Sequence, residues 1–370
     1  MLANDFWTSD SCHIAVNPHR VEESHGLSEW ATGQGMRALC FFQTSGSEGL
    51  PKWVALPKLA LLISAQAVND HFDVTAADRW LIALPLHHVG GFSILARAHL
   101  SGSSFVQYTT RWQPQTFAAL CQHEEISLVS LVPTQVHDLV RDQITCPPSL
   151  RAAIIGGGAL SSELAQRASA LGWPIYQSYG MTEAASQIAT QPYIIDGTSR
   201  LAVLPHWQTR VDEQSRLILS GPALAKGYAS MNATGHWSWQ PIGAELVTRD
   251  IVQLSDHGSQ RFLQILGRES GYVKILGELI HLAPLQARLE ALSLQRGLAS
   301  PPVILALPDA RRENRLVLAA ADSASAALLE PFNAATEALC HLTEVILLPD
   351  IPRTSLGKID LISLQRLIIY

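Results

Sequence analysis

Residues 38–53 read ALCFFQTSGSEGLPKW, and the apolar start of this stretch leads directly into a turn rich in hydroxyls and glycines. The apolar run predicts a buried strand, and the glycines after it leave backbone N–H groups exposed. Such N–H groups, with hydroxyl donors and a lysine at the edge, can cradle a polyphosphate, although an ordinary flexible loop is the alternative for this stretch taken alone. The loop differs from GxxxxGK[ST], because its lysine follows proline and precedes neither Ser nor Thr. The candidate phosphate ligands are Thr44, Ser45, Gly46, Ser47, Gly49 and Lys52.

On the C-terminal side of this loop, up to about residue 189, short apolar runs alternate with amphipathic helical patterns. Buried strands are expected at 80–84, 127–132 and 151–157, and helices at 114–125 and 161–172. Alternation of strand and helix favours a largely parallel sheet covered by helices. Residues 201–266 contain strand-like pieces separated by turns instead, which predicts a β-rich subdomain.

A smaller unit of mixed pattern follows residue 267, with helices expected at 282–295 and 328–342. The sequence therefore predicts an α/β protein of two domains. The first, residues 1–266, holds the mainly parallel sheet and the β-rich subdomain, and the second, residues 267–370, is a small α+β domain.

Composition argues against several classes of function. Of the 370 residues, 47% are hydrophobic and 16% are charged, and the net charge of -6 gives no electrostatic reason to expect nucleic acid or an anionic membrane as a partner. The five cysteines are scattered without a CxxC pair, which predicts reduced thiols rather than disulfides or a zinc site. The apolar runs are too short to span a bilayer, and the N-terminal residues lack the pattern of a secretory signal. A cytoplasmic protein with no membrane insertion is expected.

Three further segments carry polar residues that suit a nucleotide site: QSYGMTEAA (177–185), VTRDIVQL (247–254) and PRTSLGKID (352–360). Each has a plain structural alternative. Glu183 can be a carboxylate at a helix N-terminus, Asp250 a turn residue at a strand end, and Lys358 a solvated surface lysine.

Together with the loop, in this order and spacing, these segments resemble the acyl-adenylate-forming enzymes, which include acyl- and aryl-CoA synthetases, peptide-synthetase adenylation domains and luciferases. The resemblance runs from about residue 38 to the C-terminus. It implies ATP and Mg²⁺ as cofactors, coenzyme A as co-substrate, an adenylation domain over 1–266 and a mobile C-terminal domain over 267–370. It also implies roles for single residues. The adenine and acyl pocket would be flanked by Gly156, Gly157, Gly158, Tyr179 and Gly180, while Thr182 would contact phosphate and Glu183 would bind Mg²⁺. Asp250 and Arg268 would hold the ribose, Lys358 would bridge the reacting carboxylate and the α-phosphate, and Gly277 would line the pantetheine channel.

These implied roles agree with the chemistry of adenylation. Attack of a carboxylate on the α-phosphorus brings two anions together, so the site has to neutralise charge as it develops. Mg²⁺ at Glu183 and the ammonium of Lys358 would do this. In the family the C-terminal domain then rotates about a hinge, here within 267–280, and opens a channel for the thiol.

The chain departs from the family pattern at three places. Glu48 stands in the loop where the family usually has Thr, and Ser270 stands in the hinge where it usually has Asp. Only 43 residues precede Thr44, many fewer than in typical members, which predicts a shortened first subdomain.

The stretch LPLHHVGGFSILARAHLSG (84–102) corresponds to the acyl pocket of the family, with His88 expected near the reacting carboxylate. A zinc site at His87 and His88 lacks a third ligand at suitable spacing. The stretch is most similar to o-succinylbenzoate–CoA ligases of menaquinone synthesis, which carry a basic residue where Arg97 stands, and SLVPTQ (130–135) resembles them too. A dicarboxylic acid needs a cation for its unreacted carboxylate, and Arg suits that role.

Several alternatives stay open from the sequence. Arg97 can also be an arginine on a helix surface. The small-molecule carboxylic acid can be another aryl or medium-chain acid, the acceptor can be a carrier-protein thiol, and the protein can be a catalytically impaired relative that binds ATP or an acyl-adenylate. A homodimer is open as well.

Overall fold

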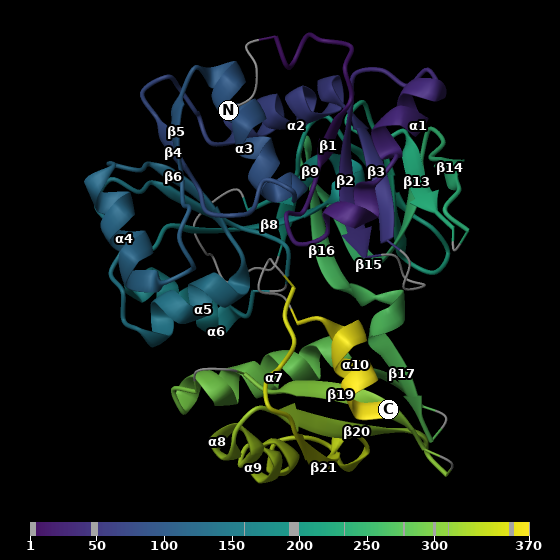
Figure 1. Ribbon diagram of the computed structural model, residues 1–370. Coiled ribbons are helices and arrows are strands. Elements are labelled where there is room, and N and C mark those ends of the chain that lie inside the picture. The colour runs from purple at the N-terminus through teal and green to yellow at the C-terminus, as the bar shows by residue number, and fades with distance from the viewer. Residues whose placement is uncertain are drawn as a thin grey trace.

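The computed structural model describes residues 5–45, 51–158, 160–191, 200–232, 234–276, 278–298, 301–309, 311–354 and 359–369. Two sheets, with helices between and outside them, make up the larger part of the molecule (Figure 1). The smaller sheet has the order β1-β2-β3-β13-β14, and its strands are β1 (His13–Ala15), β2 (Leu39–Ser45), β3 (Pro51–Pro57), β13 (Gly227–Met231) and β14 (Trp237–Pro241).

The large sheet has 11 strands in the order β11-β12-β15-β16-β10-β9-β8-β7-β6-β4-β5. Its strands are β4 (Arg79–Ile82), β5 (Ser104–Gln107), β6 (Leu128–Leu131), β7 (Ala152–Ile155), β8 (Ile175–Met181), β9 (Ser186–Thr190), β10 (Leu201–Val203), β11 (Gln208–Val211), β12 (Arg216–Ser220), β15 (Leu246–His257) and β16 (Gln260–Arg268). Strands β5, β4, β6, β7 and β8 pair in parallel, which confirms the parallel sheet expected from the alternation of strands and helices.

The β-rich segment does not form a sheet of its own. From β9 onward the pairing is antiparallel, so β10, β16, β15, β12 and β11 extend the parallel sheet. Strand β13 instead pairs with β3 in the smaller sheet, and β14 pairs with β13. The segment thereby ties both sheets together, which places its residues next to those of the phosphate loop hairpin.

Helices cover both faces of the parallel strands, because successive strand side chains point to opposite faces. Trp80, Ile82 and Leu128 lie in a core with α2 (Lys58–His71) and α3 (Val89–Ser101). Leu81 and Val129 lie in a second core with α4 (Pro114–His123), α5 (Pro133–Arg141) and α6 (Ser162–Ala170). The outer face of the smaller sheet packs against α1 (Leu27–Gly33).

The remaining elements form the smaller part, in green to yellow at the bottom of Figure 1. They are β17 (Tyr272–Ile275), β18 (Glu278–His281), α7 (Leu282–Gln295), β19 (Val303–Asp309), β20 (Glu313–Ala320), α8 (Ser323–Ala326), α9 (Leu329–Ala334), β21 (Leu342–Leu347) and α10 (Leu361–Ile369). Helix α7 contacts the larger part, because Leu294 enters the second core and Arg167 donates a hydrogen bond of 3.2 Å to the Leu294 carbonyl.

The expected helices agree with the structure except for one. Helix α6 begins as predicted after Ser161, whose hydroxyl accepts a hydrogen bond from the Leu164 N–H, and α7 has the expected bounds. The helix expected at 328–342 is wrong, because α9 ends at Ala334. The side chain of Asn333 bonds both the N–H and the carbonyl of Leu342, and this turns the chain into β21.

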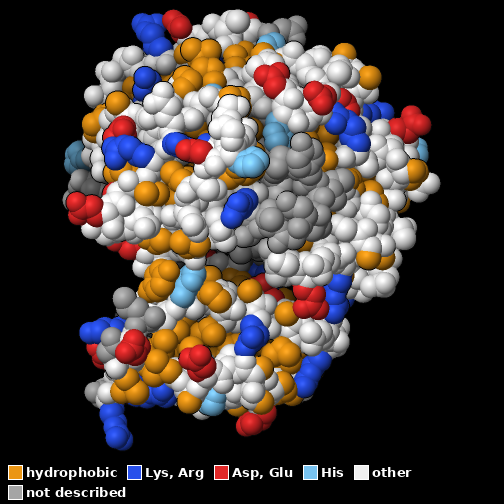
Figure 2. Space-filling view, turned by 180° about the vertical axis from the view of Figure 1, so that it is seen from behind, with side chains coloured by type: hydrophobic (Ala, Val, Ile, Leu, Met, Phe, Trp, Pro, Cys, Tyr) orange, Lys and Arg blue, Asp and Glu red, His pale blue; other side chains and the backbone are white. Residues whose placement is uncertain are grey.

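Charged side chains of both signs are interspersed on the face seen in Figure 2, where a narrow waist separates the larger part from the smaller one. Within the described ranges, every helix is too short or too polar to cross a bilayer.

A buried carboxylate ties the N-terminal ends of three parallel strands. Asp78, 8% exposed, accepts hydrogen bonds from Nε and Nη2 of Arg151 at 2.8 and 2.9 Å, from the Ser127 hydroxyl at 2.8 Å and from the Thr75 N–H at 2.9 Å. Burial acts to raise the pKa of Asp78, but these donors and the Arg151 charge outweigh it and lower the pKa to about 2.

Asp78→Asn is therefore expected to lower the free energy of unfolding at pH 7 by about 2 kcal/mol, the linkage value of this pKa shift. Because the pKa is lowered in the folded protein, the carboxylate stabilises the fold above pH 4 and this stabilisation is lost as pH falls toward 2. Urea unfolding at pH 7 and pH 3 measures the difference, which should shrink at pH 3. Asp256→Asn, which breaks an exposed pair with Arg261, is the matched control with a small effect. A loss of equal size at both pH values would contradict the role of the charge.

Candidate active site

The predicted phosphate loop joins the two strands of a hairpin. Strands β2 and β3 pair antiparallel, with Thr44 opposite Lys52 and Ser45 opposite Pro51. The Thr44 hydroxyl donates to the Lys52 carbonyl at 3.4 Å. The hairpin thus places Thr44, Ser45 and Lys52 at the two ends of the loop. The other predicted loop residues, Gly46, Ser47 and Gly49 with the divergent Glu48, lie outside the described residues.

Glu183 lies in the tight turn where the large sheet changes from parallel to antiparallel. A short 3₁₀ turn, η2 (Thr182–Ala184), joins β8 to β9 and carries Thr182 and Glu183, both half-buried. A Cβ at Gly180 would lie 1.6 Å from the Ser186 carbonyl oxygen, so this position accepts only glycine. The turn also holds Ala185 and Ser186 at φ values of 49° and 99°, and such backbone strain is typical of functional sites.

Tyr228 of β13 brings Glu183 and Lys52 into one site. The Tyr228 hydroxyl donates to Glu183 Oε1 at 3.2 Å, and the Ala225 N–H donates to the Glu183 carbonyl at 2.8 Å. The Lys52 ammonium lies 5.8 Å from the centre of the Tyr228 ring. Burial and the Glu183 carboxylate raise the pKa of Tyr228, so its hydroxyl stays protonated. Sequence reasoning missed this residue, because a single tyrosine in a strand pattern gives no signal.

Asp250 joins Tyr179 and Arg268 in a hydrogen-bonded group. The Tyr179 hydroxyl donates to Asp250 Oδ2 and Arg268 Nε donates to Oδ1, both at 2.6 Å. Asp250 and Arg268 are cross-strand neighbours on β15 and β16, and Asp250 is buried. Burial raises the pKa of Tyr179, and the charge of Asp250 adds to this effect. Each carboxylate oxygen keeps further acceptor capacity, which fits contact with ribose hydroxyls.

The glycines predicted at the pocket follow β7, beside β8. A Cβ at Gly156 would lie 3.0 Å from the Ser178 hydroxyl, and one at Gly158 would lie 3.4 Å from the Pro133 ring. Gly157 has φ of 78°. The carboxyl ends of β6, β7 and β8 meet here, and this edge is where α/β sheets bind ligands.

His88 immediately precedes α3, and Arg97 lies on that helix. Arg97 is 1% exposed, so the alternative of a surface arginine is wrong. Its guanidinium lies 5.4 Å from the Trp80 ring, and Nη1 is 3.4 Å from the hydroxyl of Ser130, a residue the sequence reasoning did not assign to the site. Arg97 Nε has no hydrogen-bond partner among the described residues, and none of their carboxylates pairs with it.

Burial lowers the pKa of Arg97 to about 9, so the guanidinium is still charged at neutral pH. A buried charge without a counter-charge is costly, and proteins rarely keep one without a use for it. This arrangement fits an anionic group of a ligand beside Arg97 and Ser130.

The oxygen atoms of the turn that carries Thr182 and Glu183 suit Mg²⁺, because this ion prefers oxygen ligands such as carboxylates. No group of three or more His, Cys, Asp or Glu side chains in the described ranges could hold a metal by itself. This suits an ion that shares its coordination with nucleotide phosphates rather than one held in a protein cage. Two other predicted residues, Gly277 and Lys358, lie outside the described residues.

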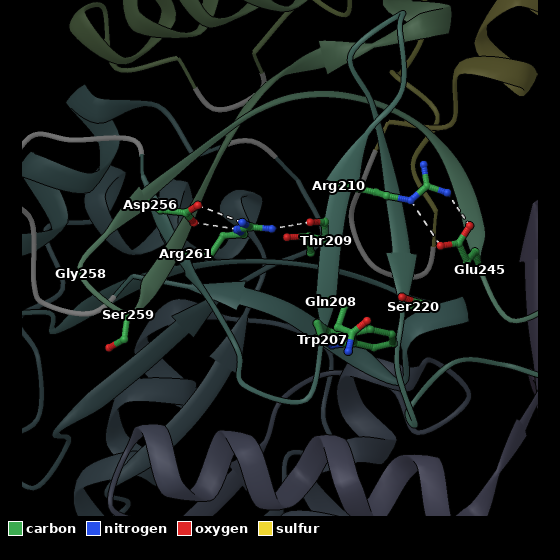
Figure 3. Close-up of a pocket in the computed structure, with 10 residues that line it drawn as sticks. All are labelled: Trp207, Gln208, Thr209, Arg210, Ser220, Glu245, Asp256, Gly258, Ser259 and Arg261. Carbon is green, nitrogen blue, oxygen red and sulfur yellow. Dashed lines mark hydrogen bonds and ion pairs between the residues drawn. The ribbon is translucent and has the colours of Figure 1, made fainter.

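A cavity of about 650 Å³ opens on the antiparallel strands, away from these residues (Figure 3). Arg261 pairs there with Asp256, at 2.7 and 2.9 Å, and also donates to the Thr209 carbonyl. Arg210 pairs with Glu245. Because both guanidiniums are neutralised and none of the predicted residues lines it, this cavity is not the candidate site.

Comparison with known proteins agrees with the resemblance. The family described as AMP-binding enzyme matches residues 16–229. The 2-succinylbenzoate–CoA ligase of Bacillus subtilis (strain 168) is 30% identical over 256 residues, which are 66% of this chain and 51% of that protein. That of Bacillus velezensis is 31% identical over 264 residues, 67% of this chain and 52% of that protein. The chain spans about half the length of the curated relatives it matches.

Solved structures share the fold. The o-succinylbenzoate coenzyme A synthetase (MenE) from Bacillus subtilis in complex with AMP has a TM-score of 0.71 at 26% identity, over 86% of this chain and 67% of that one. A variant of E. coli MenE with bound OSB-AMS has a TM-score of 0.69 at 26% identity, over 89% of this chain and 69% of that one. With the family match extending over more than half of its length, the chain belongs to the AMP-binding enzymes.

Proposed function

We propose that the protein is an ATP-dependent carboxylate–CoA ligase that works through an acyl-adenylate, with o-succinylbenzoate as its acid. The observation that carries this proposal is the convergence of Lys52, Glu183 and Asp250 near the carboxyl edge of the sheet, with Arg97 of α3 buried and without a carboxylate partner among the described residues. The names of the relatives, 2-succinylbenzoate–CoA ligases, support the same acid.

In the first half-reaction, a carboxylate oxygen of the acid attacks the α-phosphorus of ATP and pyrophosphate leaves. Lys52 and the loop it closes would hold the phosphates, and Asp250 would accept hydrogen bonds from the ribose hydroxyls. Glu183 would hold Mg²⁺, which supplies positive charge to the phosphates, and Thr182 would contact a phosphate. The resemblance assigns to Lys358 the bridging of carboxylate and α-phosphate, and to His88 a place near the reacting carboxylate.

The second carboxylate of the acid would pair with Arg97. The guanidinium is buried and charged, and the Ser130 hydroxyl beside it offers another donor. An ion pair in this position would offset the cost of burying the cation, which a monocarboxylic acid could not do. The substrate would thereby complete the charge balance of the core beneath α3.

In the second half-reaction, a thiol sulfur attacks the acyl carbon and AMP leaves. We infer coenzyme A as the thiol, and a movement of residues 267–370 relative to residues 1–266 that removes Lys358 from the site, as in the family. We also infer a cytoplasmic location, because the proposed substrates ATP and coenzyme A are found there and the cysteines are free thiols.

The first test is ATP–pyrophosphate exchange with a panel of acids that includes o-succinylbenzoate, benzoate and octanoate. Exchange should be fastest with o-succinylbenzoate. Glu183→Gln should lose most of the exchange because the metal loses a charged ligand, whereas Asp250→Ala should mainly raise the ATP concentration required. Tyr108→Phe, remote from the site, is the control. A Glu183→Gln variant with unchanged exchange would contradict the assignment, and no exchange with any acid would favour an impaired binder.

The second test concerns the acid. Arg97→Met should weaken use of o-succinylbenzoate by roughly 2–4 kcal/mol, the scale for removing one partner of a buried charge pair, and should barely change use of benzoate. The unliganded variant should be at least as stable as the wild type, because it no longer buries an unpaired charge. Measured are kcat/KM for both acids and the melting temperature. Equal losses with both acids would indicate a structural role for Arg97.

The third test separates the half-reactions. Lys358→Ala should depress acyl-adenylate formation by several orders of magnitude, since one preorganised charge at the transition state contributes about 3–4 kcal/mol. Thioester formation from a pre-made acyl-adenylate should stay near normal. Single-turnover assays of each step measure this. A parallel fall in both steps, with an intact circular dichroism spectrum, would argue against movement of the C-terminal domain.

A further inference from the structure

Strand β13 sets Tyr228 beside two residues that are far away in the sequence. In its pairing with β3, Tyr228 lies opposite Val54 and Ser230 lies opposite Lys52. Side chains alternate along a strand, so Tyr228, Val54 and Lys52 share one face of the smaller sheet. Trp53 and Ala229 point to the other face, where they pack in the core under α1. The register therefore fixes Tyr228 diagonally next to Lys52, on the side of the candidate site.

The tyrosine side chain touches two opposite charges at once. Its hydroxyl donates to Glu183 Oε1 at 3.2 Å, and the face of its ring lies 5.8 Å from the Lys52 ammonium, within the range of a cation–π contact. Lys52 and Glu183 are both described and both half-buried, and they form no ion pair with each other within 4.0 Å. One side chain thus contacts both charges, the ammonium through its ring and the carboxylate through its hydroxyl.

This separation matters because opposite charges in a half-buried site attract strongly. A direct Lys52–Glu183 pair would neutralise both groups and leave less charge for phosphate and metal. The backbone assists the separation, since the Ala225 N–H holds the Glu183 carbonyl and the Lys226 N–H holds the Ala55 carbonyl of β3. These bonds fix the distance between the turn that carries Glu183 and the strand that carries Lys52.

We propose that Tyr228 is a positioning residue of the adenylation site, whose hydroxyl holds the Glu183 carboxylate and whose ring keeps the Lys52 ammonium from pairing with it. The proposal rests on the proposed function, which makes Glu183 a metal ligand and Lys52 a phosphate contact. It assigns two separable tasks to one side chain, and each task has its own substitution. Phenylalanine keeps the ring and removes the hydroxyl, whereas leucine removes both.

The hydroxyl is tested by binding of Mn²⁺ in the presence of ATP and without any acid, followed by electron paramagnetic resonance. Tyr228→Phe should raise the Mn²⁺ dissociation constant about 3- to 10-fold, the scale of one ordinary hydrogen bond. In the Glu183→Gln background the same substitution should have no further effect, because the carboxylate it acts on is gone. Tyr108→Phe, which also removes a hydrogen-bonded phenol hydroxyl, is the matched control and should bind Mn²⁺ like the wild type.

The ring is tested by calorimetric binding of ATP in EDTA, which needs neither metal nor turnover. Tyr228→Leu should weaken ATP binding several-fold, because Lys52 would then pair with Glu183, while Tyr228→Phe should leave it within about twofold. Adding Glu183→Gln to Tyr228→Leu should restore ATP binding, since no carboxylate remains for Lys52. Circular dichroism and melting temperature check the fold of each variant.

The proposal is overturned if Tyr228→Phe binds Mn²⁺ like the wild type, or if Tyr228→Leu weakens ATP binding equally with and without Glu183→Gln. Should Tyr228→Leu fail to fold, the phenylalanine variant still decides the role of the hydroxyl. Pyrophosphate exchange by the wild type distinguishes failure of the Tyr228 proposal from failure of the proposed function. A wild type that binds Mn²⁺ and ATP but exchanges no pyrophosphate contradicts the function alone and leaves the Tyr228 comparison valid.

Discussion

The close approach of Gly180 to the Ser186 carbonyl is the constraint on which the site depends. It lets β8 and β9 turn back on each other within four residues, and the large sheet changes there from parallel to antiparallel pairing. A Cβ at position 180 would force these strands apart. The same turn presents Thr182 and Glu183 at its tip, so the switch in sheet topology and the position of the acidic side chain have one cause.

Strand β13 connects this turn to the smaller sheet. Although β10 to β16 look like one β-rich segment, their strands divide between both sheets, and β13 lies against β3. The hairpin of the phosphate loop is thereby held next to the Glu183 turn by backbone hydrogen bonds rather than by flexible side chains. A rigid frame of this kind is what a site needs to hold charges in fixed positions before the substrate arrives.

Among the described residues, many charged side chains outside the candidate site form ion pairs, whereas several of those inside it do not. Away from the site, Asp78 forms an ion pair with Arg151, and the two arginines that line the cavity of Figure 3 form ion pairs with carboxylates. In the site, Lys52 and Glu183 both contact Tyr228, and Arg97 is buried without a counter-charge among the described residues. Unpaired charges of this kind cost stability, and their concentration around one edge of the sheet is consistent with partners that a ligand supplies.

The parallel strands and most of the helices could be predicted from the sequence, because hydrophobic periodicity and turn residues are local signals. The candidate site residues were proposed from motifs that resemble those of a known family. Asp250 lies beside Arg268, and Thr44 lies opposite Lys52, as the resemblance implied. Periodicity failed at residues 335–342, where a tertiary contact of Asn333 outweighs helix propensity. Three features appear only in the folded chain: the sheet that each β-rich strand joins, the burial of Arg97 beside Ser130, and the contacts of Tyr228 with both Lys52 and Glu183. These facts depend on pairing between distant segments, and strand periodicity specifies a face but never a partner.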